Sequence, residues 1–181
     1  NTPTSHLFDI SDKFNKDYLP VAIELGRSFV QPSYQSTGNA RKGIFALDNL
    51  FDGLGILIVD NPDMKYYFGK ITMYQDFSQR AKDLIRFFLR DYMGDPDELL
   101  RPYEPLLCKG CEEEMTKLFN GEDLDSNFNI LQKEVRKLGV NIPPLVSAYM
   151  KLSPTMKSFG TSINENFGGV EETGILIRIE D

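Results

Sequence analysis

The chain has 181 residues, of which 41% are apolar and 12% aromatic, and this suits one α/β domain with a sizeable core. Its formal net charge is -7, from 27 acidic and 20 basic residues, which argues against nucleic acid as a partner. The longest apolar run, Leu54–Val59, is too short to span a bilayer. No signal peptide is visible, so we expect a cytoplasmic location. Because the sequence begins with Asn1 rather than Met, we expect a fragment or a processed form.

The N-terminal part is predicted to form short elements and then a strand. His6–Ile10 is typical of a short strand or lead-in, and Ser11 is a good N-cap for a helix that runs to Tyr18. Pro20 ends that helix, because proline removes a backbone donor. The next ten residues, Val21–Val30, are rich in β-forming side chains, and the sequence therefore predicts a strand there.

Two charged residues interrupt this predicted strand. Glu24 and Arg27 lie three positions apart, so their side chains point to opposite faces of a regular strand. A direct ion pair would need a bulge, for which Gly26 is a natural site. Charges in a central strand are costly to bury unless they are satisfied. The pair is therefore either a structural network or part of a functional site.

The segment after this strand carries a possible phosphate-binding motif. Gln35–Ala40 reads Q-x-x-G-x-A and precedes a predicted helix. Gly38 permits close backbone approach, and the first amides of the helix offer unpaired donors and a partial positive charge. The motif resembles the strand–loop–helix junction of acyl-thioester transferases of the GNAT superfamily. We expect the phosphate of a pantetheine arm to be bound by Gln35, Gly38, Asn39, Ala40 and Arg41.

Strands and helices alternate along the rest of the chain, which indicates a mixed or largely parallel sheet. Residues 94–125 are rich in Pro, Gly and acidic residues and are expected to form an excursion with a short helix near Glu113–Phe119. Ser78 is a good N-cap and Pro143 and Pro144 are well placed to open a helix. The predicted helices are Ala40–Leu57, Gln79–Met93, Asn127–Leu138 and Pro143–Leu152, and the predicted strands are Lys65–Tyr74, Met156–Ile163 and Gly174–Ile179. Residues alternate between two faces in the first of these strands, with Tyr67, Gly69, Ile71 and Met73 on one face and Tyr66, Phe68, Lys70 and Thr72 on the other.

Two further patterns have ordinary interpretations. Cys108 and Cys111 form a lone C-x-x-C, and a metal site would need two more ligands, so two reduced thiols on a loop are the favoured interpretation and no metal is expected. Lys82, Arg86 and Arg90 recur every four residues on one helix flank. Such a strip is usually a solvated face, and the alternative is contact with an acidic protein or anionic lipid headgroups.

The sequence resembles the bacterial N-acyltransferases that start ornithine- and glycine-lipid synthesis, which are often labelled hemolysins. The resemblance covers nearly the whole chain outside residues 94–125, and it is carried by Glu24–Pro32, Ala46–Gly55, Tyr67–Met73, Asn141–Val146 and Phe159–Asn164. It implies a single GNAT-like α/β domain over residues 1–181, with a mixed sheet flanked by helices and a variable excursion at 94–125. Family members carry an additional N-terminal region with the first strands of the sheet, and this chain is expected to begin after it.

The resemblance also implies a reaction. A fatty acyl group would move from acyl carrier protein to the α-amine of a small amino acid, glycine or ornithine. Glu24 would act as the base or hold the ammonium, Arg27 would hold the acceptor's carboxylate or stabilise the local network, and Tyr149 would protonate the leaving thiolate. No tightly bound cofactor is expected; the donor is the phosphopantetheine thioester of the carrier, or acyl-CoA. Arg41 and Lys42 are candidates for contacting the acidic carrier.

Two alternatives belong to other functional classes. One is a non-catalytic, lipid- or membrane-associated protein with the same sheet, making a peripheral contact with the anionic inner face of the cytoplasmic membrane. The other is an acyl-homoserine-lactone synthase, which the E-L-x-R-x-x-V block from Glu24 to Val30 resembles. A Ser–His–Asp hydrolase is disfavoured, because the chain has one histidine, His6, and no G-x-S-x-G elbow.

Overall fold

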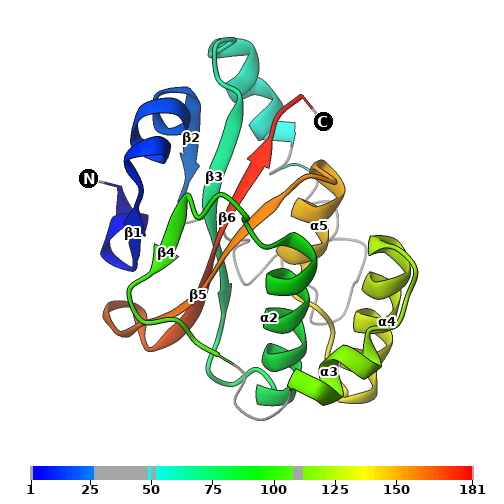
Figure 1. Ribbon diagram of the computed structural model, residues 1–181. Coiled ribbons are helices and arrows are strands. Elements are labelled where there is room, and N and C mark those ends of the chain that lie inside the picture. Colours follow the sequence, from blue (N-terminus) through cyan, green and yellow to red (C-terminus); the bar gives the residue numbers. More distant parts are fainter. Residues whose placement is uncertain (1, 27–48, 50–51, 108–111, 181) are drawn as a thin grey trace.

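The computed structural model describes residues 2–26, 49, 52–107 and 112–180 (Figure 1). They form a four-stranded mixed sheet in the order β2-β3-β6-β5, and a two-stranded ribbon of β1 and β4. The sheet strands are β2 (Ala22–Leu25), β3 (Tyr66–Met73), β6 (Val170–Arg178) and β5 (Lys157–Asn164). β2 runs parallel to β3, whereas β3, β6 and β5 pair antiparallel. The expected α/β class, with a mixed sheet flanked by helices, is confirmed.

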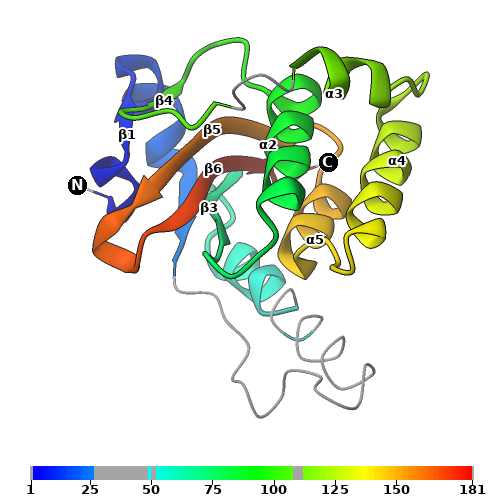
Figure 2. The ribbon, with the colours of Figure 1, turned by 90° about the horizontal axis from the view of Figure 1, so that it is seen from below.

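Helices cover one face of the sheet, which we call the helical face (Figure 2). They are α2 (Gln79–Met93), α3 (Glu112–Leu118), α4 (Leu124–Lys137), α5 (Pro144–Leu152) and a helical stretch over residues 52–60. The core beneath them contains Tyr67, Ile71 and Met73 of β3 and Ile175 and Ile177 of β6, packed against apolar side chains of the helices. The alternation predicted for residues 65–74 is therefore confirmed, because every second side chain of β3 enters this core.

The N-terminal segment covers the opposite face, which we call the aromatic face. Helical turns at Pro3–His6 and Phe14–Tyr18 lie around β1 (Phe8–Ile10), which pairs antiparallel with β4 (Leu100–Pro102). Here Phe14 packs within 5.0 Å of Phe68 and 6.2 Å of Phe159, measured between ring centroids. Figure 2 shows the resulting three layers, with the ribbon of β1 and β4 on one side of the sheet and α2, α4 and α5 on the other.

Local capping signals predicted several elements well. Ser11 Oγ accepts a hydrogen bond from Phe14 N at 3.1 Å, Ser78 caps α2 through Ala81 N, and α5 opens at Pro144. α4 begins at Leu124 rather than Asn127, because Asp123 and Ser126 form a capping box in which each side chain accepts the other's backbone N–H.

Two predictions of strand placement need correction. The region from 94 to 125 was expected to hold only one short helix, yet Leu100–Pro102 forms β4, and both Leu99 and Leu100 are buried. The last strand begins at Val170 rather than Gly174. Its first half contains Glu171 and Glu172, which pair with basic side chains from other elements. These ion pairs make two buried carboxylates tolerable within a strand.

The basic strip on α2 is not a free surface. Lys82 Nζ lies 3.1 Å from Glu171 Oε1, and Arg86 Nη1 lies 3.1 Å from Glu171 Oε2. Arg86 also pairs with Asp83, and Arg90 makes a bidentate pair with Glu112. The interpretation of this strip as a solvated face or a docking surface is therefore wrong for Lys82 and Arg86, whose side chains are buried against β6.

Candidate functional site

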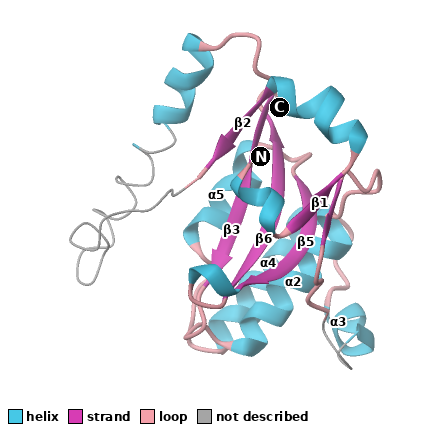
Figure 3. Ribbon diagram, turned by 90° about the vertical axis from the view of Figure 1, so that its left-hand side faces the viewer, coloured by secondary structure: helices cyan, strands magenta, loops and turns pink. Residues whose placement is uncertain are grey.

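Glu24 belongs to β2, an edge strand of the described sheet (Figure 3). Its side chain lies on the aromatic face. Its neighbours Ile23 and Leu25 pack against the core of the helical face, and successive side chains of a strand point to opposite faces. In the register of the parallel pair, Glu24 stands beside Phe68 of β3, a member of the aromatic cluster. The carboxylate is half-buried and close to the N-terminal turn.

Thr4 fixes one oxygen of this carboxylate. Glu24 Oε1 accepts hydrogen bonds from Thr4 N at 3.1 Å and from Thr4 Oγ1 at 2.8 Å. Thr4 is fully buried in the turn Pro3–His6. Among the described residues no hydrogen bond reaches Oε2 of Glu24, so the carboxylate is oriented through one oxygen and keeps acceptor capacity on the other.

A second polar group occupies the same face, further along β3. Lys70 Nζ lies 2.8 Å from Glu172 Oε2, and the two side chains are 17% and 6% exposed. Glu172 also accepts hydrogen bonds from Asn164 at 2.9 Å and from Thr72 at 3.4 Å. No pattern in the sequence pointed to Thr4 or Lys70 as site residues. The predicted alternation of residues 65–74 already grouped Lys70 with Phe68, but only the register of β2 against β3 brings Glu24 to that row.

The two parallel strands approach closely just before β2 ends. A Cβ on Gly69 would lie 3.0 Å from the Leu25 carbonyl oxygen, so this contact needs glycine or a shift of backbone. At Gly26 a Cβ would meet no atom of the described residues within 4 Å. β3 continues to Met73, whereas β2 ends at Leu25. The strand pair is thus tight beside Leu25 and open at the following residue.

Tyr149 lies on the other side of the sheet from Glu24. It belongs to α5 and is buried in the core of the helical face. Burial raises the pKa of its phenol above the usual value, so the group is protonated throughout the neutral range. The structure therefore does not gather Glu24 and Tyr149 into one cluster on one face.

Six predicted site residues lie outside the described residues: Arg27, Gln35, Gly38, Asn39, Ala40 and Arg41. Lys42, Cys108 and Cys111 lie outside them as well. In the sequence, the motif Gln35–Ala40 lies between β2 and β3. These two strands are parallel neighbours in the sheet. In open α/β sheets, ligands bind in the crevice outside the carboxyl ends of such strands.

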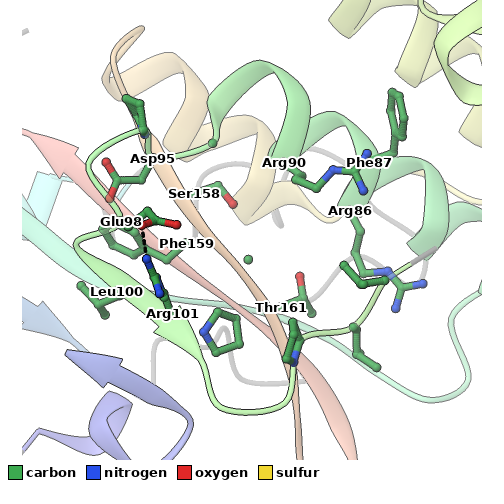
Figure 4. Close-up of a pocket in the computed structure, with 17 residues that line it drawn as sticks. Arg86, Phe87, Arg90, Asp95, Glu98, Leu100, Arg101, Ser158, Phe159 and Thr161 are labelled. Carbon is green, nitrogen blue, oxygen red and sulfur yellow. Dashed lines mark hydrogen bonds and ion pairs between the residues drawn. The ribbon is translucent and has the colours of Figure 1, made fainter. Parts of the chain in front are cut away.

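A cavity of about 440 Å³ lies at the other edge of the sheet (Figure 4). β5 forms its floor with Ser158, Phe159 and Thr161, while Arg86 and Arg90 of α2 and the chain around Leu100 form its walls. β2 and β5 are the two outer strands of the described sheet, so this cavity is separate from Glu24. Its guanidinium groups already have carboxylate partners.

Within the described residues, no helix has the length and apolar character needed to cross a membrane. The same part of the chain contains no group of three or more His, Cys, Asp or Glu residues arranged to hold a metal ion.

Comparison with known proteins gives two strong matches. The chain is 55% identical over 178 residues to a protein of Bacteroides thetaiotaomicron named glycine N(alpha)-acyltransferase, covering 98% of this chain and 53% of that protein. It is 52% identical over 178 residues to a protein of the same name from Phocaeicola vulgatus, covering 98% of this chain and 55% of that protein. No protein-family model matches the chain, and no solved structure matches it significantly. The chain therefore resembles two glycine N(alpha)-acyltransferases along nearly all of its own length, and it spans about half of theirs.

Proposed function

We propose that the protein is an N-acyltransferase that moves a fatty acyl group from a thioester to the α-amine of glycine, as a step in membrane aminolipid synthesis. The donor is acyl carrier protein, with acyl-CoA as the alternative, and the protein acts in the cytoplasm or at the inner face of the cytoplasmic membrane. The observation that carries the proposal is the oriented carboxylate of Glu24 at the end of β2, in a chain 55% identical over 178 residues to a glycine N(alpha)-acyltransferase.

The reaction needs a base close to the acceptor. The amine attacks the thioester carbonyl, the C–N bond forms and the C–S bond breaks. Only an unprotonated amine is a nucleophile, so a base positioned beside the amine must remove its proton. We assign this role to Glu24, because Thr4 occupies Oε1 and fixes the orientation of the carboxylate. The other oxygen is the one that would receive the proton.

The reaction also needs stabilisation of two developing negative charges. Backbone N–H groups where β2 parts from β3 would donate to the oxyanion. Tyr149 would donate its O–H to the leaving sulfur, since its raised pKa keeps the phenol protonated. Glu24 and Tyr149 lie on opposite faces of the sheet, so we propose that the thioester reaches the site from the carboxyl end of β2, beyond Leu25. Arg27 remains a predicted contributor to this network.

The proposed fold assignment follows from the same arrangement. We propose a GNAT-like fold in which the motif Gln35–Ala40 binds the phosphate of the pantetheine arm at the carboxyl end of β2. The relatives are about twice as long as this chain, and we propose that further strands adjoin β2 in the complete sheet. Arg41 and Lys42 are the proposed contacts for an acidic carrier, since Lys82 and Arg86 are occupied by Glu171.

The proposal is tested by following free thiol. Purified protein is incubated with fatty acyl carrier protein or acyl-CoA, and thiol release is measured with glycine, with ornithine and without amino acid. We expect release that depends on the amino acid and is fastest with glycine. Equal rates of thiol release from acyl carrier protein and from acyl-CoA would contradict a specific role for the carrier protein. An absence of thiol release with every amino acid would contradict the proposed enzyme activity.

A further inference from the structure

We propose that Lys70 binds the carboxylate of the amino-acid acceptor and so makes the site selective for α-amino acids over simple amines. This inference rests on the proposed function and deepens it. It assigns the acceptor's two charged ends to two strands: the amine to Glu24 on β2 and the carboxylate to Lys70 on β3.

The register of the strands supports this assignment. Glu24 stands beside Phe68, and Lys70 follows two residues later on the same face of β3. Diagonal neighbours on adjacent strands are about 7–8 Å apart, and their Cβ atoms are somewhat closer, which is within reach of long side chains. The amine and carboxylate of an α-amino acid are separated by one carbon, so we propose that one zwitterion hydrogen-bonds to both side chains. A longer acceptor would also fit if its side chain points away from the sheet.

The exposure and the partners of the Lys70 ammonium also support its proposed role in binding the acceptor's carboxylate. A side chain that is 17% exposed still reaches solvent, unlike Lys82 on the opposite face, whose side chain is 7% exposed. An ammonium has three donors, and the described residues provide one partner, Glu172. Glu172 in turn accepts hydrogen bonds from Asn164 and Thr72. Glu172 therefore orients the lysine while other donors help to satisfy its own charge.

The surrounding chain provides walls for a small acceptor. Thr4 lies over Glu24, and Phe8 packs against Gly174, the residue paired with Lys70 on β6. A Cβ on Gly174 would lie 3.2 Å from Phe8 Cζ. The N-terminal turn and the aromatic cluster thus limit the space on one side of the proposed acceptor position, which suits a small amino acid.

Other basic residues are less suitable for this role. Arg178 pairs in register with Tyr66 at the other end of β3, and Lys157 lies on β5, where it pairs with Asp95 and Asp97. Lys70 shares the face of Glu24 and lies on the strand next to it.

The test compares glycine with glycinamide, which keeps the amine and lacks the carboxylate charge. In the wild type we expect kcat/KM to favour glycine. Lys70→Met should reduce that preference roughly 10- to 100-fold, the range expected for losing a charged hydrogen bond, mainly by raising KM for glycine. Lys70→Arg should retain the preference, and Lys157→Met, a paired lysine on β5, should leave it unchanged.

A purely structural role for Lys70 gives a different result. In that case Lys70→Met lowers kcat/KM for glycine and glycinamide by the same factor, and this overturns the inference. Because Lys70→Met leaves Glu172 without its cation, the double variant Lys70→Met/Glu172→Gln is measured too, and it should show the same loss of preference. An active wild type without preference for glycine overturns the Lys70 inference alone. A wild type that acylates no amine overturns the proposed function and this inference together.

Discussion

The two oxygens of the Glu24 carboxylate differ in their hydrogen bonding. Two donors from Thr4 hold one oxygen, and the second oxygen is left to act on a ligand in the account we propose. The carboxylate is half-buried rather than enclosed, so a small acceptor can reach it. A general base works only when its geometry is fixed and its lone pair is accessible, and we propose that Glu24 meets both requirements.

Replacing Glu24 by Gln should therefore separate activity from folding. Gln keeps a carbonyl oxygen that can accept the two hydrogen bonds from Thr4, but it cannot take a proton at neutral pH. We expect kcat to fall by about 10²- to 10⁴-fold with little change in the melting temperature. Asp9→Asn, an exposed acidic residue on β1, is the matched control. Unchanged kcat in Glu24→Gln would exclude the base role.

The proposed role of Tyr149 is tested by changing the leaving group of the acyl donor. Tyr149→Phe removes one oxygen from a buried side chain, and kcat should fall on the order of 10²-fold with an alkyl thioester donor. The deficit should shrink with an aryl thioester, whose thiolate leaves without help. Tyr103→Phe, at an exposed tyrosine, is the control. A deficit of the same size with both donors would mean that Tyr149 supports packing and not proton donation.

At the scale of elements, the sequence predicted best where local signals define a segment. α2 has a serine cap and an apolar stripe, and α5 begins with proline; both have nearly the predicted bounds. The apolar run Gly174–Ile179 predicted only the second half of β6. Glu171 and Glu172 look solvent-facing until their basic partners on other elements are known. Such partners are distant in sequence, so no local sequence pattern predicts them.

The same reasoning explains what could be predicted of the candidate site. Glu24 was found because a charge in an apolar strand is unusual. The contact of Thr4 with Glu24 and the position of Lys70 on the same face were missed, because they depend on where the N-terminal turn packs and on the register of β2 against β3. β4 was missed for a related reason, since its three residues pair with residues of β1 that lie 90 to 94 positions earlier in the sequence.

The ion pairs between α2 and β6 should contribute strongly to stability. Glu171→Ala leaves Lys82 and Arg86 buried without their shared carboxylate. Breaking a buried pair typically costs 3–5 kcal/mol, so we expect a loss of about that size in the free energy of unfolding, measured by urea denaturation. Glu180→Ala, at an exposed acidic residue, should change it by less than about 0.5 kcal/mol. A loss under about 1 kcal/mol in Glu171→Ala would contradict the buried network.

The capping box of α4 gives a pH-dependent prediction. Hydrogen bonds from the Ser126 side chain and backbone lower the pKa of Asp123. A carboxyl group with a lowered folded pKa contributes stability above its unfolded pKa, about 3.9, and loses it as pH falls through the folded value. Asp123→Asn keeps an acceptor oxygen without the charge, so its melting temperature should fall less steeply between pH 5 and about pH 2. Parallel pH profiles for the two proteins would refute this role.

At the scale of the whole molecule, we propose that the sheet separates binding of the acceptor from binding of the donor. In our account the acceptor binds on the aromatic face beside Glu24, and the donor arm approaches from the carboxyl end of β2, next to the helical face that holds Tyr149. The chain carries a net charge of -7, and the basic residues of α2 that are buried against Glu171 are unavailable to an acidic carrier. We therefore expect carrier binding to depend on Arg41 and Lys42 and to weaken as salt rises.

The most direct measurement of the central claim is the product itself. Wild-type protein and Glu24→Gln are incubated with a fatty acyl thioester and ¹³C-labelled glycine, and the organic extract is analysed by mass spectrometry. The account predicts a labelled N-acylglycine in the wild-type reaction and about 10²-fold less or lower in the variant. Equal amounts of labelled product from both proteins, or free fatty acid as the only product of the wild type, would contradict it.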